Sequence, residues 1–207
     1  MDLHEMAQLR ALAYRFVATL YLGQPDAAWL ESLVREGLLA DFPVPTGNAD
    51  MVEGLERIAS ACDGLALGLV TGADLRADYD QLFVGPDHLP SPPWESVYRT
   101  EERLVFDWPA LEVKSEYRKL GLVSIKPSDP DDHVGLELLF MAILAERQAE
   151  GDEVALPAQQ RFLREHLLQW APAFCGDVVA NARTDLFRGL GLLTRGLLTQ
   201  EQALLQP

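Results

Sequence analysis

The sequence has few of the residues that mark a secreted or membrane protein. Its two cysteines, Cys62 and Cys175, stand far apart in apolar surroundings, so neither a disulfide scaffold nor a cysteine-rich metal site is indicated. No apolar run approaches the roughly 18 to 20 residues that a membrane span requires. Acids stand near Met1, where a signal peptide would carry Lys or Arg. We therefore expect a soluble, cytoplasmic protein without integral membrane association.

Basic residues are also scarce. There are 17 Lys and Arg against 32 Asp and Glu, which gives a net charge of −15. This balance argues against nucleic acid as a partner, because phosphate binding draws its affinity from clustered basic side chains. A basic peptide is a better electrostatic match, although solubility alone explains the acidity of many proteins.

The common catalytic motifs are missing. The chain contains no Gly-x-Ser-x-Gly, no Gly-x-x-x-x-Gly-Lys-Ser/Thr, no Gly-x-Gly-x-x-Gly and no His-Glu-x-x-His sequence. These motifs serve acyl transfer, phosphate binding, dinucleotide binding and zinc catalysis respectively. We therefore expect no catalytic residues, no bound cofactor and no metal.

Strand patterns are missing as well, and helical periodicity takes their place. No window alternates apolar and polar residues, whereas apolar residues recur at spacings of three and four along most of the chain. The predicted helices cover residues 2–21, 25–38, 49–63, 71–83, 101–108, 109–120 and 129–150, two more between 157 and 182, and one from 184 onward. This pattern predicts an all-α, single-domain helical bundle of about nine or ten helices over residues 1–207.

Capping residues fix the expected ends of these helices. Asp2, Thr71 and Asp129 are predicted N-caps, and Pro25 and Pro130 are predicted first-turn residues. Glycines after the helices at 109–120 and 129–150 are predicted C-terminal stops, namely Gly121 and Gly151.

The segment 84–98, between the N-terminal and C-terminal helical parts, is rich in proline. Its prolines are Pro86, Pro90, Pro92 and Pro93. Proline fixes its own φ, removes a backbone donor and pushes the preceding residue toward extended conformations. We therefore expect a stiff, open loop without regular secondary structure, which suits recognition of a partner.

Aromatic and acidic side chains gather around this loop. Trp94, Glu95 and Tyr98 lie within it, and Tyr79 and Phe83 precede it. Rings beside carboxylates suit a peptide that carries arginine and apolar side chains, because a guanidinium pairs with carboxylates and stacks on rings. Burial in the core also explains Tyr79 and Phe83, which stand at helical spacing. Trp94, among prolines, is better explained as a surface anchor.

A second unusual stretch runs from Asp129 to His133 and puts acids and an imidazole at a predicted helix start. Capping and the helix dipole explain the acids alone. His133, however, stands four residues before Glu137 and beside Asp132, so the three could share one face. This leaves open a small acid–base or metal-dependent enzyme, although a metal would need a further ligand from another helix.

Together these stretches resemble the TorD/DmsD family of redox-enzyme maturation chaperones and, more distantly, the NarJ type. One motif is Tyr79-x-x-Leu-Phe-x-Gly-Pro86 leading to Pro92-Pro-Trp-Glu-Ser-Val-Tyr98. Another is Asp129-Pro-Asp-Asp-His133, with Asp129 where the family has Glu. The third is His166-x-x-x-Trp170 with Phe174 downstream.

The resemblance implies a cytoplasmic all-α chaperone rather than an enzyme. Such proteins bind the twin-arginine signal peptide of a molybdenum-cofactor oxidoreductase, and often its folded or apo body, before export. Carried over, the signal-peptide groove comprises Trp94, Glu95, Ser96, Tyr98, Asp132 and His133, with Tyr79 and Phe83 forming its wall. The sequence leaves open which oxidoreductase is the client and whether a nucleotide or the molybdenum cofactor is bound. It also leaves open whether the chain is a monomer or a domain-swapped homodimer.

Overall fold

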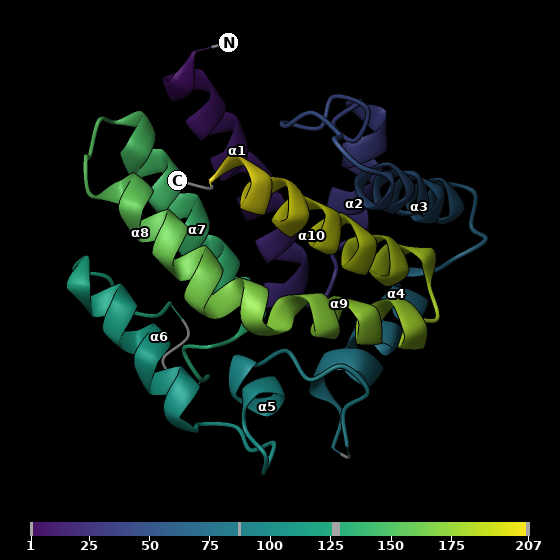
Figure 1. Cartoon of the computed structure of the whole chain (residues 1–207). Helices are drawn as coiled ribbons and strands as arrows, with labels where there is room; N and C mark the ends of the chain where they lie inside the picture. The colour runs from purple at the N-terminus through teal and green to yellow at the C-terminus, as the bar shows by residue number, and fades with distance from the viewer. Residues whose placement is uncertain (1, 87, 126–128, 206–207) are drawn as a thin grey trace. The chain divides into compact units, whose positions relative to one another are not determined.

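The described part of the chain is built from helices joined by loops. The structure, a computed structural model, describes residues 2–86, 88–125 and 129–205. Within these ranges it has ten α-helices, two π-helical turns and no strand (Figure 1), so the all-α prediction is confirmed. No helix in the described ranges combines the length and the apolar character needed to cross a membrane. Asp87 of the predicted loop lies outside these ranges.

Backbone contacts divide the chain into two compact units, each made of segments far apart in the sequence. Unit 1 comprises Met1–Leu22, Pro93–Ala173 and Glu201–Pro207. Unit 2 comprises Gly23–Pro92 and Phe174–Gln200. Helices α9 and α10 each contribute residues to both units.

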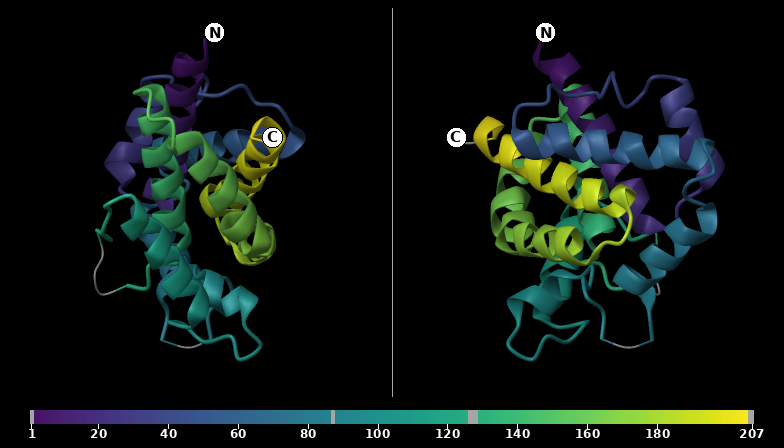
Figure 2. Two further views of the ribbon diagram at one scale, coloured as in Figure 1. Left: turned by 60° about the vertical axis from the view of Figure 1, so that its left-hand side comes forward. Right: turned by 90° about the vertical axis from the view of Figure 1, so that its right-hand side faces the viewer.

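Unit 1 is built around α1 and α7. Its helical elements are α1 (Leu3–Leu22), α5 (Glu95–Arg99), α6 (Trp108–Lys119), α7 (Val134–Ala149), α8 (Ala155–Phe162), η2 (Leu163–Leu167) and the beginning of α9 (Leu168–Asn181). A Cβ added to Gly135 would lie 2.7 Å from Cγ of Leu22, so glycine allows α7 to approach α1 closely. Helix α8 packs on α7 in turn (Figure 2).

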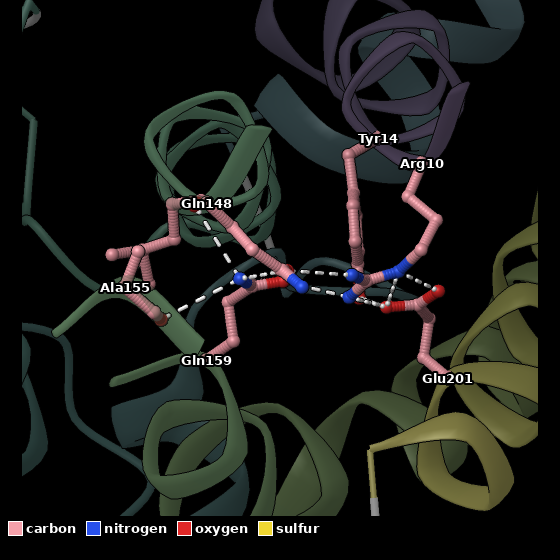
Figure 3. Close-up of polar contacts among 7 residues, drawn as sticks. Arg10, Tyr14, Gln148, Ala155, Gln159 and Glu201 are labelled. Carbon is pink, nitrogen blue, oxygen red and sulfur yellow. Dashed lines mark hydrogen bonds and ion pairs between the residues drawn. The ribbon is translucent and has the colours of Figure 1, made fainter. Parts of the chain in front are cut away.

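A buried polar network fixes the last turn of α10 in unit 1 (Figure 3). Nε of Arg10, on α1, donates to Oε1 of Glu201 at 2.7 Å, and Nη2 of Arg10 donates to Gln159 Oε1 at 2.7 Å. The Tyr14 hydroxyl donates to Oε2 of Glu201 at 2.9 Å. Both charged side chains are almost fully buried, so the pair depends on these hydrogen bonds for its stability.

Unit 2 is built around α3 and α10. Its helical elements are α2 (Ala27–Arg35), α3 (Ala49–Ala66), α4 (Gly72–Tyr79), η1 (Asp80–Val84), the end of α9 and most of α10 (Asp185–Leu204). The right-hand view of Figure 2 shows α3 and α10 side by side. Glycines on both helices bring the backbones together, since a Cβ on Gly189 would lie 2.6 Å from the carbonyl oxygen of Gly54.

Several predicted helix ends are confirmed. The Asp2 carboxylate accepts a first-turn N–H of α1 at 2.7 Å, and Thr71 forms a reciprocal capping box with Asp74 at the start of α4. Gly121 and Gly151 follow α6 and α7 with φ of +71° and +88°, the left-handed conformation that glycine adopts without strain. Capping chemistry was therefore readable from the sequence at these positions.

Other predicted boundaries are wrong. Asp26 caps α2 by accepting two backbone N–H groups, which places Pro25 outside the helix rather than in its first turn. The helix predicted over 101–108 does not form, and residues 101–107 are not helical, because Arg103 and Phe106 adopt left-handed φ values of 52° and 68°. Helix α6 instead begins at Trp108, with Asp107 as its cap.

The proline-rich loop and the helix after it also differ from expectation. The prediction of no regular structure in 84–98 is wrong at its end, where Glu95–Arg99 forms α5. The long helix predicted from Asp129 begins only at Val134, with His133 as its N-cap. Both differences have one cause, the pairing of these two segments described next.

Candidate functional site

Backbone hydrogen bonds in unit 1 join the two stretches that the sequence singled out. Trp94 and His133 form an isolated antiparallel bridge. The N–H of Val134 donates to the carbonyl of Pro93 at 2.8 Å, and the N–H of Glu95 donates to the carbonyl of Asp132 at 3.0 Å. Residues 132–134 thus pair with 93–95 instead of continuing a helix toward Asp129, which is why α7 starts late.

The Asp132 side chain explains why α5 forms directly after two prolines. Its Oδ2 accepts the backbone N–H of Ser96 at 2.7 Å, so it satisfies a donor in the first turn of α5 that would otherwise have no partner. Asp132, Glu95 and Ser96 are all fully buried. Burial raises the pKa of the Asp132 carboxyl above its ordinary value. The buried Asp132 carboxylate therefore fixes the start of α5.

A carboxylate–imidazole pair does form, but not between the predicted residues. Oε2 of Glu95 lies 3.0 Å from Nδ1 of His166, which comes from η2, and both side chains are buried. Arg99, one turn after Glu95, forms an ion pair with the same carboxylate. His166 entered the sequence analysis only through the resemblance motif, since nothing local links residues 71 positions apart.

Glu137 lies in the same buried region. Its Oε2 accepts the indole N–H of Trp170 at 3.2 Å, and its side chain is fully buried. Burial first, and then repulsion from the Glu95 and Asp132 carboxylates, hold the pKa of Glu137 well above its ordinary value. The Glu95 and Asp132 carboxylates are therefore close enough to disfavour ionisation of Glu137.

His133 has a capping role. Its Nδ1 accepts the backbone N–H of Gly135 at 3.1 Å, and its ring meets that of Trp94 edge-on with centroids 6.0 Å apart. Asp132, His133 and Glu137, which the sequence offered as an acid–base set, thus serve two helix caps and a bond to Trp170. No group of three or more His, Cys, Asp or Glu among the described residues is arranged to hold a metal ion.

The aromatic residues at the two ends of α5 remain partly exposed. Trp94 and Tyr98 are each half-buried, and the Tyr98 ring leans on Trp170 with centroids 5.5 Å apart. The guanidinium of Arg103 lies 5.5 Å from the centre of the Tyr98 ring, and that of Arg99 lies 4.7 Å from the Trp108 ring. These contacts were not predicted from the sequence, although arginines four residues apart among aromatics are the signal that could have revealed them.

Tyr79 and Phe83 belong to unit 2. They are 6% and 3% exposed, with ring centroids 5.3 Å apart, and both rings also meet Phe187. This burial agrees with the interpretation of Tyr79 and Phe83 as core residues, which the sequence also allowed. Their part in a peptide groove stays a prediction.

The raised pKa of Glu137 gives stability a distinct dependence on pH. The unfolded chain releases this proton near the ordinary value of 4.5, whereas the folded chain keeps it to higher pH. Over that interval the folded state binds more protons, so rising pH lowers the free energy of unfolding. Glu137→Gln removes the titration and keeps an acceptor for Trp170. We expect the variant to gain stability relative to wild type as pH rises above 4.5.

Urea unfolding at about pH 5, 7 and 8.5 tests this expectation. Glu150→Gln, a change at an exposed acid that ends the same helix, is the matched control and should follow the wild-type curve. Parallel curves for Glu137→Gln and wild type across this range would show that Glu137 ionises normally in the folded chain.

Comparison with known proteins places the chain in a family. Residues 45–176, more than half of the chain, match a family model described as nitrate reductase delta subunit. The chain belongs to this family. Chaperone protein YcdY of Escherichia coli (strain K12) is 31% identical over 87% of each chain. Chaperone protein TorD of Vibrio cholerae is 30% identical over 84% of this chain and 81% of its own. The predicted TorD/DmsD membership is confirmed.

Shorter and more distant matches agree. The Tat proofreading chaperone DmsD of Salmonella typhi is 34% identical over 60% of this chain. The match spans about three fifths of the length of the DmsD relatives. A crystal structure described as a redox enzyme maturation protein from Archaeoglobus fulgidus has a TM-score of 0.53 and 21% identity, covering 89% of this chain and 91% of that one. This last likeness supports the fold.

Proposed function

We propose that this chain is a cytoplasmic chaperone that binds the twin-arginine signal peptide of a molybdenum-cofactor oxidoreductase precursor. It would hold the precursor, and its apo-enzyme body, while the cofactor is inserted and before export. The names of the relatives support this function, since YcdY and TorD are called chaperones and DmsD a Tat proofreading chaperone. They support a chaperone and not an enzyme.

One observation in the structure carries the proposal. Side chains that could serve an enzyme, Glu95, Asp132, His133 and Glu137, are buried and engaged in helix capping or in bonds to His166 and Trp170. Trp94, by contrast, is half-buried at the start of the helix that these groups support. Buried groups that hold a partly exposed aromatic in place make a preorganised binding surface.

The predicted site residues act in two ways: some contact the peptide, and others hold the contacting residues in position. Trp94 and Tyr98 contact the peptide directly, because tryptophan and tyrosine supply rigid apolar area at small cost in conformational entropy. Glu95, Ser96, Asp132 and His133 act as positioning residues beneath them. The net charge of −15 favours approach of a leader with two adjacent arginines. No cofactor of the chaperone's own takes part.

We infer that the two compact units form one functional domain over residues 1–207, acting as a monomer or as a domain-swapped homodimer. The cytoplasm is the expected compartment, because a leader must be bound before its precursor is exported.

Replacing Trp94 tests the site. We expect Trp94→Ala to weaken binding of a synthetic twin-arginine leader by about 1–3 kcal/mol, the range for an aromatic interface anchor. Isothermal titration of the full chain measures this. Trp29→Ala, which removes a half-buried tryptophan from unit 2, is the matched control and should leave the affinity unchanged.

The leader itself supplies the second arm of this test. A twin-lysine leader should bind the wild-type chain more weakly, because lysine lacks the planar fork that pairs with a carboxylate in two places. Absence of binding with both leaders would refute the proposed function. Equal loss in Trp94→Ala and Trp29→Ala would refute only the site.

A further inference from the structure

An exposed apolar segment follows α5 directly. Five apolar side chains within eight residues face solvent, a set that we call the apolar ridge: Leu104, Val105, Phe106, Trp108 and Leu111. Phe106 and Leu111 are each 67% exposed and Leu104 is 56% exposed. Scattered apolar residues on a surface need no explanation, but five exposed ones within eight residues of sequence are a concentration typical of interaction sites.

The backbone holds these side chains out at a conformational cost. Phe106 has a φ of 68° and Arg103 one of 52°, a left-handed region that is unfavourable for a residue with a Cβ. Contacts hold residues 103–108 in this conformation: the Asp107 carboxylate accepts the Trp108 N–H at 2.6 Å, and the Arg103 guanidinium lies over the Tyr98 ring. Strain kept by surrounding contacts is a feature of functional sites.

Unpaired carboxylates border the ridge. Glu101, Glu102 and Glu112 are exposed, and none forms an ion pair with any residue of the described ranges. Between residues 101 and 112 there are four acids, the three glutamates and Asp107, and one base, Arg103. The surface thus joins apolar area to negative charge, and it is continuous with Tyr98 through Arg103.

We infer that the apolar ridge binds the apolar run of the leader, with Glu101, Glu102 and Glu112 facing its two arginines. This inference rests on the proposed function and assigns a place to each half of the peptide. Charge selects the occupant: a second copy of this chain, at −15, would bring acids against acids, whereas a leader with adjacent arginines before an apolar run complements both features. Trp94 and Tyr98 then form one end of the surface and Leu111 the other.

A double substitution on the ridge is the test. Leu104→Ser with Phe106→Asn removes two apolar side chains, and asparagine tolerates the left-handed backbone at 106. The matched control is Leu67→Ser with Leu69→Asn, which removes two side chains that are 73% and 77% exposed around a turn of unit 2. Each full-length chain is titrated calorimetrically with a twin-arginine leader and with a leader whose apolar run is replaced by serine.

The expected result is about tenfold weaker leader binding by the ridge variant and unchanged binding by the control. With the serine-substituted leader, wild type and ridge variant should bind equally, since the lost contact is already absent. If wild type binds the leader and the ridge variant binds it equally well, the inference about the ridge is wrong and the proposed chaperone function still stands. No binding of the leader by wild type would overturn the function and the ridge with it.

Discussion

Removing the Glu201 carboxylate should destabilise the chain by about 3–5 kcal/mol, the range for breaking a buried ion pair from one side. In Glu201→Ala the Arg10 guanidinium stays buried without its counter-charge, and the Tyr14 hydroxyl loses its acceptor. The two remaining partners of Arg10, Gln148 and Gln159, are neutral amides (Figure 3). Urea unfolding followed by circular dichroism measures the loss.

Helix α1, which carries Arg10, also provides the control. Arg15 pairs with Glu146 at 2.6 Å, but their side chains are 42% and 40% exposed, so Arg15→Ala should cost less than about 1 kcal/mol. A double variant, Arg10→Met with Glu201→Met, should recover much of the loss, because apolar side chains of similar volume leave no buried charge. A Glu201→Ala cost no larger than that of Arg15→Ala would mean that water reaches the network.

Helices with strong local signals could be predicted, and the one that depends on a distant residue could not. Thr71 and Asp74 cap the start of α4, and Gly121 ends α6. Each bonds or turns only residues next to it in the sequence, so a short stretch of sequence is enough to predict it. Helix α5 exists because the Asp132 carboxylate, 36 residues away, accepts the N–H of Ser96. Four prolines in the preceding loop gave the opposite local signal.

The candidate site shows the same division. The sequence singled out the stretches around Trp94 and His133, and the structure pairs them. It linked the wrong acid to the wrong imidazole, however, since helical spacing suggested His133 with Glu137 while the fold brings Glu95 to His166. A helix-face argument holds only where the helix exists, and α7 begins after His133.

The close packing of α3 on α10 in unit 2 gives the last large effect. We expect Gly54→Ala to lower the free energy of unfolding by about 3 kcal/mol. A Cβ at position 54 would lie 2.6 Å from the Leu193 nitrogen and 2.8 Å from the Gly189 carbonyl oxygen. Both atoms are backbone, so no side chain can turn aside, and α3 must move away from α10. Thermal or urea unfolding of the variant measures the loss.

Gly176→Ala is the control for Gly54→Ala, because it makes the same change inside α9 where nothing lies within 4 Å of the new methyl group. Alanine is favoured over glycine by about 1 kcal/mol in a helix interior, so this variant should be more stable than wild type. The two substitutions are therefore expected to have opposite signs, although helix propensity favours both. Stabilisation by Gly54→Ala as well would mean that α3 and α10 are not in close contact at Gly54.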